Sequence, residues 1–572
     1  MDGAGARAVW TARAPLIVRV TSHVAVWLAV LIPVSVVLSK GWLPIGDDAA
    51  IAIRSSQTFS FYPPLVGLTS TAGNGLGHYL YDPGPLLFWL LAIPVHLDAN
   101  RGLLWGAALL TGAAFSLSIE AVWSSKLWIG CAIVSFVAVD LLWLTPEVLE
   151  NPAWNAFFPL PFFVASIVLA WRVGSGSFAW WPVLVFTASV AAQSHLMFVI
   201  PSVLLALSAP MLGLLTSDRS GRSRWFFWGL GVGLACWIAP LVQNLGSYGN
   251  LTGLLKSGSG QTRYGLSFGL HMLARSGSPV PIWLTHRPLS FVALLSTTAS
   301  NSPVIGVIVL LLLTLTVVFA WRHGNMALEV LSIVCLTCAL SLVAAYSIVP
   351  QRNGISLYYL IAPLWIVGIL IWTVLAWCLV DLASVAITAR RLRAGTGSAT
   401  QSDLIGLPVD GSPDVGGGRR PGTRTAIVGY CAVAVIFAVG IAGFLQLRSF
   451  QPSETLVDWN QSDAASVRSV TQAVERSIPK GEVFVGIRSS SSSSLSAFWI
   501  TEGVAWQLHS DGWTPGLAFI GASYTGLQVP LHKDVTAVLV TLDEATVTSI
   551  KHARCTTNFY KCVKALNSSH QG

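Results

Sequence analysis

Long apolar runs, each bounded by polar or turn-forming residues, recur along most of this chain. A helix needs about 20 apolar residues to cross a bilayer, because its backbone amides must find hydrogen-bond partners within the segment itself. Eleven runs approach this length, and we predict a membrane-spanning helix in each: residues 16–39, 103–123, 127–145, 157–171, 178–194, 196–215, 225–245, 303–320, 327–346, 355–378 and 425–445. The stretch 178–215 is too long for one crossing, so we divide it at the polar residues Gln193, Ser194 and His195.

A shorter apolar run, residues 85–97, decides the direction of every later span. It is flanked by Asp82 and Asp98 and is too short to cross a bilayer comfortably. If it does not cross, the predicted inner segments carry Lys and Arg at more than twice the density of the outer segments. Cytoplasmic loops of membrane proteins collect Lys and Arg. We therefore predict an interfacial or re-entrant helix at 85–97, a cytoplasmic N-terminus at 1–15, a membrane domain over 16–389 and a long first outer loop at 40–102.

The last third of the chain changes character. Residues 390–424 are rich in Gly, Ser and Pro and are bracketed by Arg, which is typical of a flexible cytoplasmic linker. After the span at 425–445, residues 446–572 have the mixed pattern of a soluble α/β domain, with helices near 463–477 and 495–508 and strands near 482–487 and 536–542. An odd number of spans places this domain outside the cytoplasm. In that oxidising compartment we predict a disulfide between Cys555 and Cys562.

Composition agrees with a membrane protein and excludes other classes. Charged residues make up 10% of the chain and apolar residues 53%, whereas about 25% of a typical soluble chain is charged. A disordered chain, a disulfide-rich miniprotein and a nucleic-acid-binding protein are excluded. The net charge of +8 reflects orientation in the membrane. The predicted fold class is a multi-pass α-helical membrane protein of the cell membrane, surrounded by lipid, with a small extracytoplasmic α/β domain.

Few charged residues are left on the outer face of the membrane domain. The acidic pair Asp47-Asp48 follows the first span directly. Adjacent carboxylates repel and raise one another's pKa unless a cation lies between them. Taken alone, such a pair is more often a solvated turn, but its loop also carries Arg54, His78 and Asp82 among many aromatic, Pro and Gly residues. Together these side chains offer an acid/base pair, a cation for a phosphate group and ligands for a metal ion.

Three further polar residues lie at or near the predicted outer surface. Arg352 lies between two late spans, where its planar guanidinium can bind phosphate with two hydrogen bonds or can serve as a plain loop cation. His195, at a helix end, can line a site or hydrogen-bond its neighbours. Asp140 lies inside the third span, and ionisable groups at membrane depth are functional by default. We expect Asp140 to face a cavity.

Five short motifs follow one another along the predicted membrane domain. They are Gly46-Asp47-Asp48, Tyr81-Asp-Pro-Gly-Pro-Leu-Leu-Phe-Trp89, Asn151-Pro-Ala-Trp-Asn155, Ala192-Gln-Ser-His195 and Gly249-Asn-Leu-Thr-Gly-Leu-Leu255. In this order the chain resembles the GT-C superfamily of polyprenyl-phosphate-dependent glycosyltransferases over about residues 16–380. That superfamily includes protein O-mannosyltransferases, lipid A aminoarabinose transferases and arabinofuranosyltransferases. The later motifs are similar to those of an actinobacterial group of membrane proteins within it.

The resemblance implies an inverting enzyme that moves a sugar from a polyprenyl phosphate to a glycan, lipid or protein acceptor at the outer face of the membrane. Members use an acidic residue of the first outer loop as base, in several cases with a divalent metal. Carried over, Asp47 is the general base and Asp48 its partner, which holds the acceptor or, with Asp82, a metal ion such as Mg, Mn, Ca or Zn. Many relatives have His where this chain has Asp82. The candidates for the donor phosphate are Arg54, Arg352 and His78, and those for a cavity or the acceptor are Asp140, Asn155 and His195.

Two functions of other classes compete with glycosyl transfer. A transporter or flippase would show paired broken helices in two related halves, and the sequence contains no such internal repeat. A non-catalytic envelope scaffold would use its external domain to bind a partner, and it would be favoured if Asp47 and Asp48 pointed away from any cavity.

Overall fold

A computed structural model describes most of the chain. The described residues are 3–70, 80–125, 127–144, 146–216, 222–246, 249–257, 262–278, 302–351, 358–395, 454–477, 480–488, 495–517, 534–541 and 546–554. His78, Arg352, Cys555 and Cys562 lie outside these ranges, so their predicted roles stay predictions.

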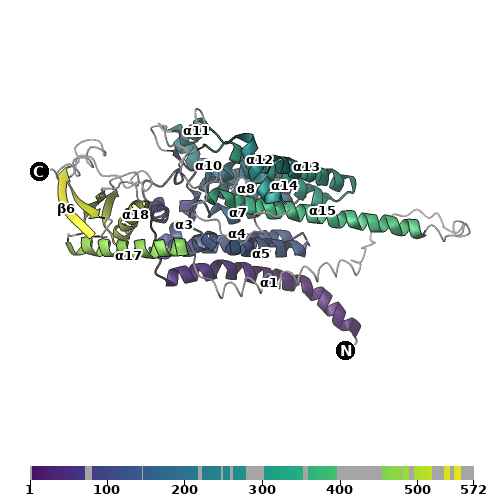
Figure 1. Ribbon diagram of the computed structural model, residues 1–572, viewed down its shortest axis with the longest axis horizontal. Coiled ribbons are helices and arrows are strands. Elements are labelled where there is room, and N and C mark those ends of the chain that lie inside the picture. Colours follow the sequence, from purple (N-terminus) through teal and green to yellow (C-terminus); the bar gives the residue numbers. More distant parts are fainter. Residues whose placement is uncertain are drawn as a thin grey trace, which may run out of the picture.

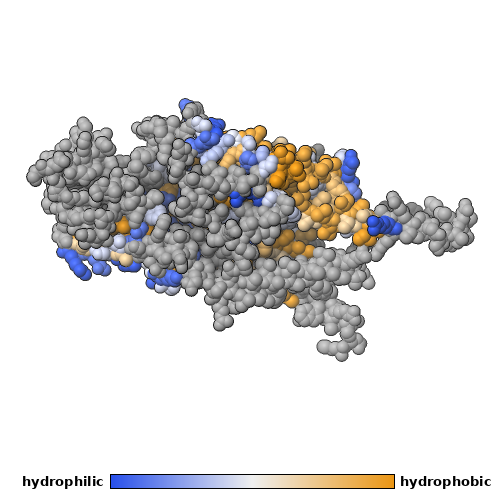
Figure 2. Space-filling view, viewed as in Figure 1, coloured by the Kyte–Doolittle hydropathy of each residue, from blue (hydrophilic) through white to orange (hydrophobic). Residues whose placement is uncertain are grey.

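Helices dominate the described chain, and the longest lie side by side in one bundle (Figure 1). Seven are long and apolar enough to cross a membrane: Pro15–Ser39, Gly102–Trp123, Leu196–Leu215, Ser223–Leu245, Pro303–Arg322, Met326–Ser347 and Ala362–Ile387. Three shorter helices, at Leu86–Leu97, Trp128–Leu141 and Pro159–Gly174, are also apolar. The chain is therefore a multi-pass helical membrane protein. Figure 2 shows part of its apolar surface, in orange, over the region of α13, α14 and α15.

The bundle helices follow the predicted apolar runs closely. Their bounds are α1 Gly3–Ser39, α4 Gly102–Trp123, α5 Trp128–Leu144, α7 Pro159–Gly174, α8 Trp181–Ser194, α9 Val199–Thr216, α10 Arg222–Leu245, α13 Pro303–Arg322, α14 Met326–Ser347 and α15 Ala362–Gly395. Each carries one predicted span. The eleventh run, 425–445, lies outside the described residues, so the count of eleven stays a prediction. Helix α15 continues to Gly395, so residues 390–395 of the predicted flexible linker are helical.

The predicted division of residues 178–215 is confirmed. Helix α8 ends at Ser194, and His195 takes an extended backbone conformation with φ −159° and ψ 136°. A 3-10 turn, Leu196–Phe198, then leads into α9. The imidazole Nδ1 of His195 accepts a hydrogen bond from the Met197 N–H at 3.2 Å, which satisfies one of the free amides at the new helix start.

Capping residues explain the tight reversal between α13 and α14. At the end of α13, Gly324 takes a left-handed conformation with φ 67°, as glycine does just beyond many helix ends. The next residue, Asn325, accepts a hydrogen bond from the Leu328 N–H at 3.2 Å and so caps α14. The short connection makes the two helices antiparallel neighbours.

Both long loops that were predicted to lie outside contain helices or strands among their described residues. The first contains α2 (Asp47–Ser56), a 3-10 turn (Gln57–Phe59), a two-residue ladder of β1 (Thr69–Ser70) with β2 (Leu80–Tyr81), and α3 (Leu86–Leu97). Helix α3 is the predicted short helix, and it packs against α2, α4 and α8. Between α5 and α7 lies the short helix α6 (Pro146–Glu150).

The second predicted outer loop, 246–302, contains α11 (Asn250–Lys256) and α12 (Gly265–Gly277), and α12 packs against α13, α14 and α15. Part of this loop therefore belongs to the bundle.

The C-terminal part is the predicted α/β domain. Its elements are α17 (Glu454–Ser477), β3 (Glu482–Arg488), α18 (Leu495–Ser510), β4 (Thr514–Leu517), β5 (Asp534–Thr541) and β6 (Thr546–Arg554). The sheet order is β4-β3-β5-β6, with β3 parallel to β4 and β5, and β6 antiparallel to β5. In Figure 1 this domain lies at the opposite end of the bundle from the N-terminus.

The domain shares a hydrophobic core with the loop after α1. Leu43 and Ile45 of that loop are buried together with Val467 of α17 and with Ile500 and Val504 of α18. Burial of apolar surface is the main favourable contribution to such contacts. The segment that leads into Asp47 is thus held between the bundle and the C-terminal domain.

Candidate functional site

One turn of the chain contacts three of the four acidic residues that the sequence singled out. Residues 151–155 form a turn between α6 and α7, in which the Trp154 N–H donates to the carbonyl oxygen of Asn151 at 3.3 Å. Proline at position 152 suits the second place of such a turn. Three donors project from this turn: Asn151 Nδ2 to Asp48 Oδ2 at 2.8 Å, Trp154 Nε1 to Asp47 Oδ2 at 2.8 Å, and Asn155 Nδ2 to Asp82 Oδ2 at 3.0 Å. We call Asp47, Asp48 and Asp82 the carboxylate cluster.

The carboxylate cluster is held by neutral donors. Asp48 and Asp82 are 6% and 3% exposed, while Asp47 is half-buried. Within the described ranges, none of the three forms a salt bridge. Asp48 Oδ1 is buried and has no hydrogen-bond partner among those residues. A buried acceptor without a partner costs free energy, so this oxygen is available to a hydroxyl group that enters the site.

Burial changes the acidity of the whole cluster. The pKa of Asp48 is raised to about 7, mainly by loss of hydration; the hydrogen bond from Asn151 opposes this rise, and the Asp47 charge adds to it. Burial likewise raises the pKa of Asp82 to about 8, against hydrogen bonds from Asn155 and from the backbone of Leu196. The pKa of Asp47 is also raised by burial and is lowered in part by Trp154. A carboxylate whose pKa lies near the working pH is suited to accept a proton.

The other two motifs meet at the same place. Asp82 accepts from the backbone of Leu196, directly after the motif that ends at His195. A Cβ at Gly84 would lie 2.1 Å from Gln193 Oε1, so only glycine allows this approach. Asn250 binds the backbone of Tyr81 twice, accepting from its N–H at 2.9 Å and donating to its carbonyl at 3.1 Å. All five motifs therefore converge on one end of the bundle.

The remaining predicted residues have different positions. Arg54 lies on α2 and donates to Gln57 Oε1 at 2.8 Å. Burial lowers the pKa of His195 to about 4, so its imidazole is neutral near pH 7. Asp140 lies on α5, and no interaction between described residues joins it to the carboxylate cluster; its Oδ2 is buried there without a partner. The structure thus brings Asn155 and the turn at His195 to the cluster, and the predicted role of Asp140 stays a prediction.

A divalent metal was expected at Asp48 and Asp82. Within the described part of the chain, no group of three or more His, Cys, Asp or Glu side chains is arranged to hold a metal ion. Divalent ions such as Mg²⁺ keep several water ligands and often bind through only one or two carboxylates, so the metal at Asp48 and Asp82 stays a prediction.

Sequence reasoning assigned no role to several residues of the site. Two of the quoted motifs contain such residues: Asn151 and Trp154 belong to Asn-Pro-Ala-Trp-Asn, and Asn250 belongs to Gly-Asn-Leu-Thr-Gly. Membership of these motifs was the available signal. Glu502, in the C-terminal domain, gave no signal at all. It is 6% exposed, and burial together with the charge of Asp47 raises its pKa well above the usual range for Glu.

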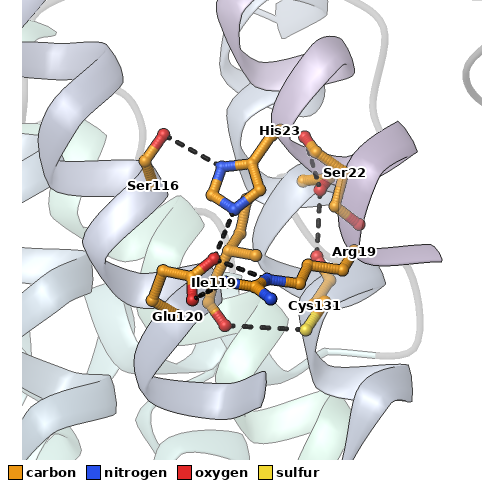
Figure 3. A network of polar contacts seen from close by, with 8 residues as sticks. Arg19, Ser22, His23, Ser116, Ile119, Glu120 and Cys131 are labelled. Carbon is orange, nitrogen blue, oxygen red and sulfur yellow. Dashed lines mark hydrogen bonds and ion pairs between the residues drawn. The ribbon is translucent and has the colours of Figure 1, made fainter. Parts of the chain in front are cut away.

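A second polar cluster lies elsewhere in the bundle, between α1, α4 and α5 (Figure 3). Arg19 donates from Nε and Nη2 to the two carboxylate oxygens of Glu120, at 2.8 and 2.5 Å. His23 Nε2 lies 2.7 Å from Glu120 Oε1, and its Nδ1 lies 3.2 Å from Ser116 Oγ. We call Arg19, His23 and Glu120 the ion-paired cluster. In the sequence, the signal for this cluster was the presence of Arg19 and Glu120 inside the first two predicted spans.

Comparison with known proteins finds similar solved structures but no matching family model or curated protein. Among solved structures, the chain is similar to the crystal structure of ArnT from Cupriavidus metallidurans bound to undecaprenyl phosphate. The two chains share 14% identity, the alignment covers 92% of this chain and 93% of that one, and the TM-score is 0.43. A TM-score of this size does not establish a common fold, so we draw no conclusion about this chain from it.

Proposed function

We propose that this protein is a GT-C glycosyltransferase that moves a sugar from a polyprenyl-phosphate donor to a hydroxyl group of an envelope glycan, lipid or protein. One observation carries the proposal: a single turn of the chain orients Asp47, Asp48 and Asp82 together at one end of a membrane-embedded bundle. A donor with a lipid tail can reach such a site laterally from the bilayer. The motif resemblance described above supports the same function.

Asp47 is the general base in this proposal. It is the most exposed member of the carboxylate cluster, and the Trp154 N–H fixes one of its oxygens. The acceptor hydroxyl transfers its proton to Asp47 while its oxygen forms a bond to C1 of the sugar. The C1–O bond to the phosphate breaks, and the electron pair leaves with the polyprenyl phosphate. Attack from the side opposite the leaving group inverts the configuration at C1.

Asp48 and Asp82 support this step. The unpartnered Oδ1 of Asp48 can accept a hydrogen bond from the acceptor sugar or alcohol. Asp82 joins the turn 151–155 to the start of the segment at Leu196 and so holds the site together. Negative charge that develops on the leaving phosphate requires cationic or N–H donors. Arg54, on the same helix as Asp47, supplies the described guanidinium nearest in sequence to the base.

The proposal is tested by replacing the base. Purified protein in lipid nanodiscs is given synthetic polyprenyl-phosphate hexoses and pentoses together with an envelope extract as acceptor, and release of free polyprenyl phosphate is measured by mass spectrometry. We expect Asp47→Asn to lower the rate by about 10²–10⁴-fold, the usual contribution of a general base. Glu120→Gln is the matched control, because it neutralises a carboxylate of the ion-paired cluster.

Two results would contradict parts of this proposal. Transfer by Asp47→Asn at the rate of the unaltered protein would remove Asp47 from the role of base. Glycosyl transfer itself would be contradicted if no donor released polyprenyl phosphate while the protein moved an intact donor across a vesicle bilayer, which is the result expected of a flippase. A scaffold would give neither product release nor movement.

A further inference from the structure

Helix α18 of the C-terminal domain lies against the loop that leads into Asp47. The Gly46 N–H donates to the carbonyl oxygen of Trp499 at 3.3 Å. A Cβ at Gly46 would lie 2.4 Å from the Trp499 indole, so the ring rests directly on this backbone. One turn further along α18, a Cβ at Gly503 would lie 3.0 Å from Ile45 Cγ2 and 3.4 Å from the Pro44 carbonyl oxygen.

Glu502 shares this face of α18. Residues three and four apart project from the same side of a helix, and Glu502 stands between Trp499 and Gly503, both of which contact the loop. Its side chain is buried, at 6% exposure, at the interface where α18 packs on α2. A buried carboxyl at an interface between domains costs stability.

Several contacts hold α18 in this place. Trp506 Nε1 donates to the carbonyl oxygen of Ala99 at 3.1 Å, and Gln507 Nε2 donates to Asn100 Oδ1 at 2.9 Å. His509 Nε2 lies 3.2 Å from Ser56 Oγ at the end of α2. The helix is therefore tied to both ends of the first outer loop, and its position relative to α2 is fixed.

We propose that Glu502 is a positioning residue for Asp47, a neutral carboxylic acid that the C-terminal domain places beside the base, so that docking of this domain completes the transfer site. This inference rests on the proposed function. It makes the external domain part of the catalytic unit and assigns a role to a carboxyl at the far end of the sequence.

Electrostatics agrees with a neutral Glu502. Burial first, and the Asp47 charge second, raise its pKa well above the usual range, so Glu502 keeps its proton while Asp47 is ionised. Two neighbouring carboxyls then share one negative charge. Charged residues on the elements packed against α18 also include Asp48 and Arg54 on α2 and Asp463 and Arg468 on α17. Among the described residues, Asp47 is the one whose charge acts on Glu502.

The experiment compares Glu502→Gln with Glu502→Ala in the nanodisc transfer assay across pH. Gln imitates the protonated acid, so we expect Glu502→Gln to keep transfer near neutral pH and to lose the fall in kcat/KM that ionisation of Glu502 causes at alkaline pH. We expect Glu502→Ala to lose at least about tenfold in kcat, because Asp47 is then poorly oriented. Glu475→Gln, on the exposed side of α17, is the matched control and should behave as the unaltered protein.

Thermal unfolding provides a readout that does not depend on transfer. The unfolded chain ionises Glu502 above about pH 4.3, whereas the folded chain does not, so stability falls as pH rises through this window. Glu502→Gln should therefore raise Tm at pH 7, and the gain should disappear near the unfolded pKa. The gain should be smaller in an Asp47→Asn background, because the charge that acts on Glu502 is gone.

The outcomes separate this inference from the proposed function. Full transfer by Glu502→Ala, or the same alkaline fall in Glu502→Gln as in the unaltered protein, overturns the role of Glu502 while glycosyl transfer stands. If Glu502→Gln raises Tm equally with and without Asp47→Asn, the pairing of the two carboxyls is overturned. Absence of transfer from the unaltered protein overturns the proposed function and, with it, the catalytic role of Glu502.

Discussion

The carboxylate cluster and the ion-paired cluster solve the same problem in opposite ways. Glu120 is surrounded by cationic or protonatable partners, since Arg19 binds both of its oxygens and His23 binds one of them. Asp47, Asp48 and Asp82 are each held by a neutral N–H group of one turn. An acid in apolar surroundings must be paired with a cation or gain proton affinity. The first arrangement neutralises a charge, and the second keeps a proton acceptor ready.

This difference teaches where chemistry is possible in an apolar chain. A bidentate Arg–carboxylate pair is a strong structural link with little capacity left for a substrate. The carboxylate cluster keeps unsatisfied acceptor capacity at Asp48 Oδ1 and pKa values near neutrality. The acids best suited to accept a proton are therefore also the ones whose burial costs stability.

Apart from replacement of the base itself, the largest effect is expected from a change that separates α18 from the carboxylate cluster. Gly46 has φ 55°, and an added Cβ would lie 2.4 Å from the Trp499 ring. Gly46→Ala must therefore displace the helix or the loop, at a cost of roughly 2–4 kcal/mol from the left-handed backbone and the overlap. A displacement of this kind costs about 100-fold in rate. Transfer kinetics and thermal unfolding measure both effects.

Gly324→Ala is the matched control for that change. Gly324 also has a positive φ, of 67°, but nothing lies within 4 Å of the Cβ position. We expect a loss of about 1 kcal/mol and an unchanged transfer rate. Equal losses of transfer in the two alanine variants would show that docking of α18 is irrelevant to the site.

An intermediate effect, of opposite sign in the two clusters, is expected from removing one carboxylate charge. The folded pKa of Asp82, about 8, exceeds its unfolded value of about 3.9, so the unfolded chain is ionised and the folded chain protonated between these values. Stability therefore falls as pH rises through this window. Asp82→Asn should raise stability by roughly 2–4 kcal/mol at pH 7, and the gain should vanish near pH 4.

Glu120→Gln should do the reverse. Arg19 and His23 lose a charged acceptor, and stability at pH 7 should fall by roughly 1–2 kcal/mol, a discounted figure because the Arg19 and Glu120 side chains are each 35% exposed. Thermal unfolding of both variants at several pH values checks the signs. If both changes destabilise the protein at pH 7, the distinction between the two clusters is wrong.

The smallest effect is expected from removing one neutral donor. Trp154→Phe keeps a ring but removes the N–H that binds Asp47 Oδ2 at 2.8 Å. Because this hydrogen bond lowers the pKa of Asp47, its loss should move the acid limb of kcat/KM to higher pH and reduce transfer roughly 3–10-fold at pH 7. Trp171→Phe is the control, since that indole donates to the Ala327 carbonyl, away from the site. An unmoved acid limb in Trp154→Phe would remove Asp47 from the role of base.

Much of the helical architecture was predictable because the bilayer imposes a length and an apolar composition on each span. The break at Gln193, Ser194 and His195 followed from the same constraint. The helix at Gly265–Gly277 was missed because it is short and has Gly, Ser and Arg among its apolar residues. It packs closely where glycine leaves room, as at Gly269 against the Val343 carbonyl. The hydrophobic pattern of the sequence does not reveal such contacts.

The candidate site was predictable in its acids but not in their partners. Asp47, Asp48 and Asp82 stood out because charge is rare in this chain, and Asn155 came from the motif resemblance. Trp154 and Asn151 were read as part of a motif without a role. Asp140 was expected to face a cavity because charge is also rare inside the spans, and it lies on α5 with a buried oxygen that has no partner among the described residues.

The sequence by itself determined that this is a membrane protein, where its spans lie and which few acids remain outside them, because hydrophobic length and scarcity of charge are local properties. Only the tertiary structure decided which donor binds which carboxylate, that residues 151–155 orient Asp47, Asp48 and Asp82, and that α18, which carries Glu502, packs on α2, which begins at Asp47. Such pairings join residues far apart in sequence, and they depend on how helices and loops pack in space rather than on any local pattern.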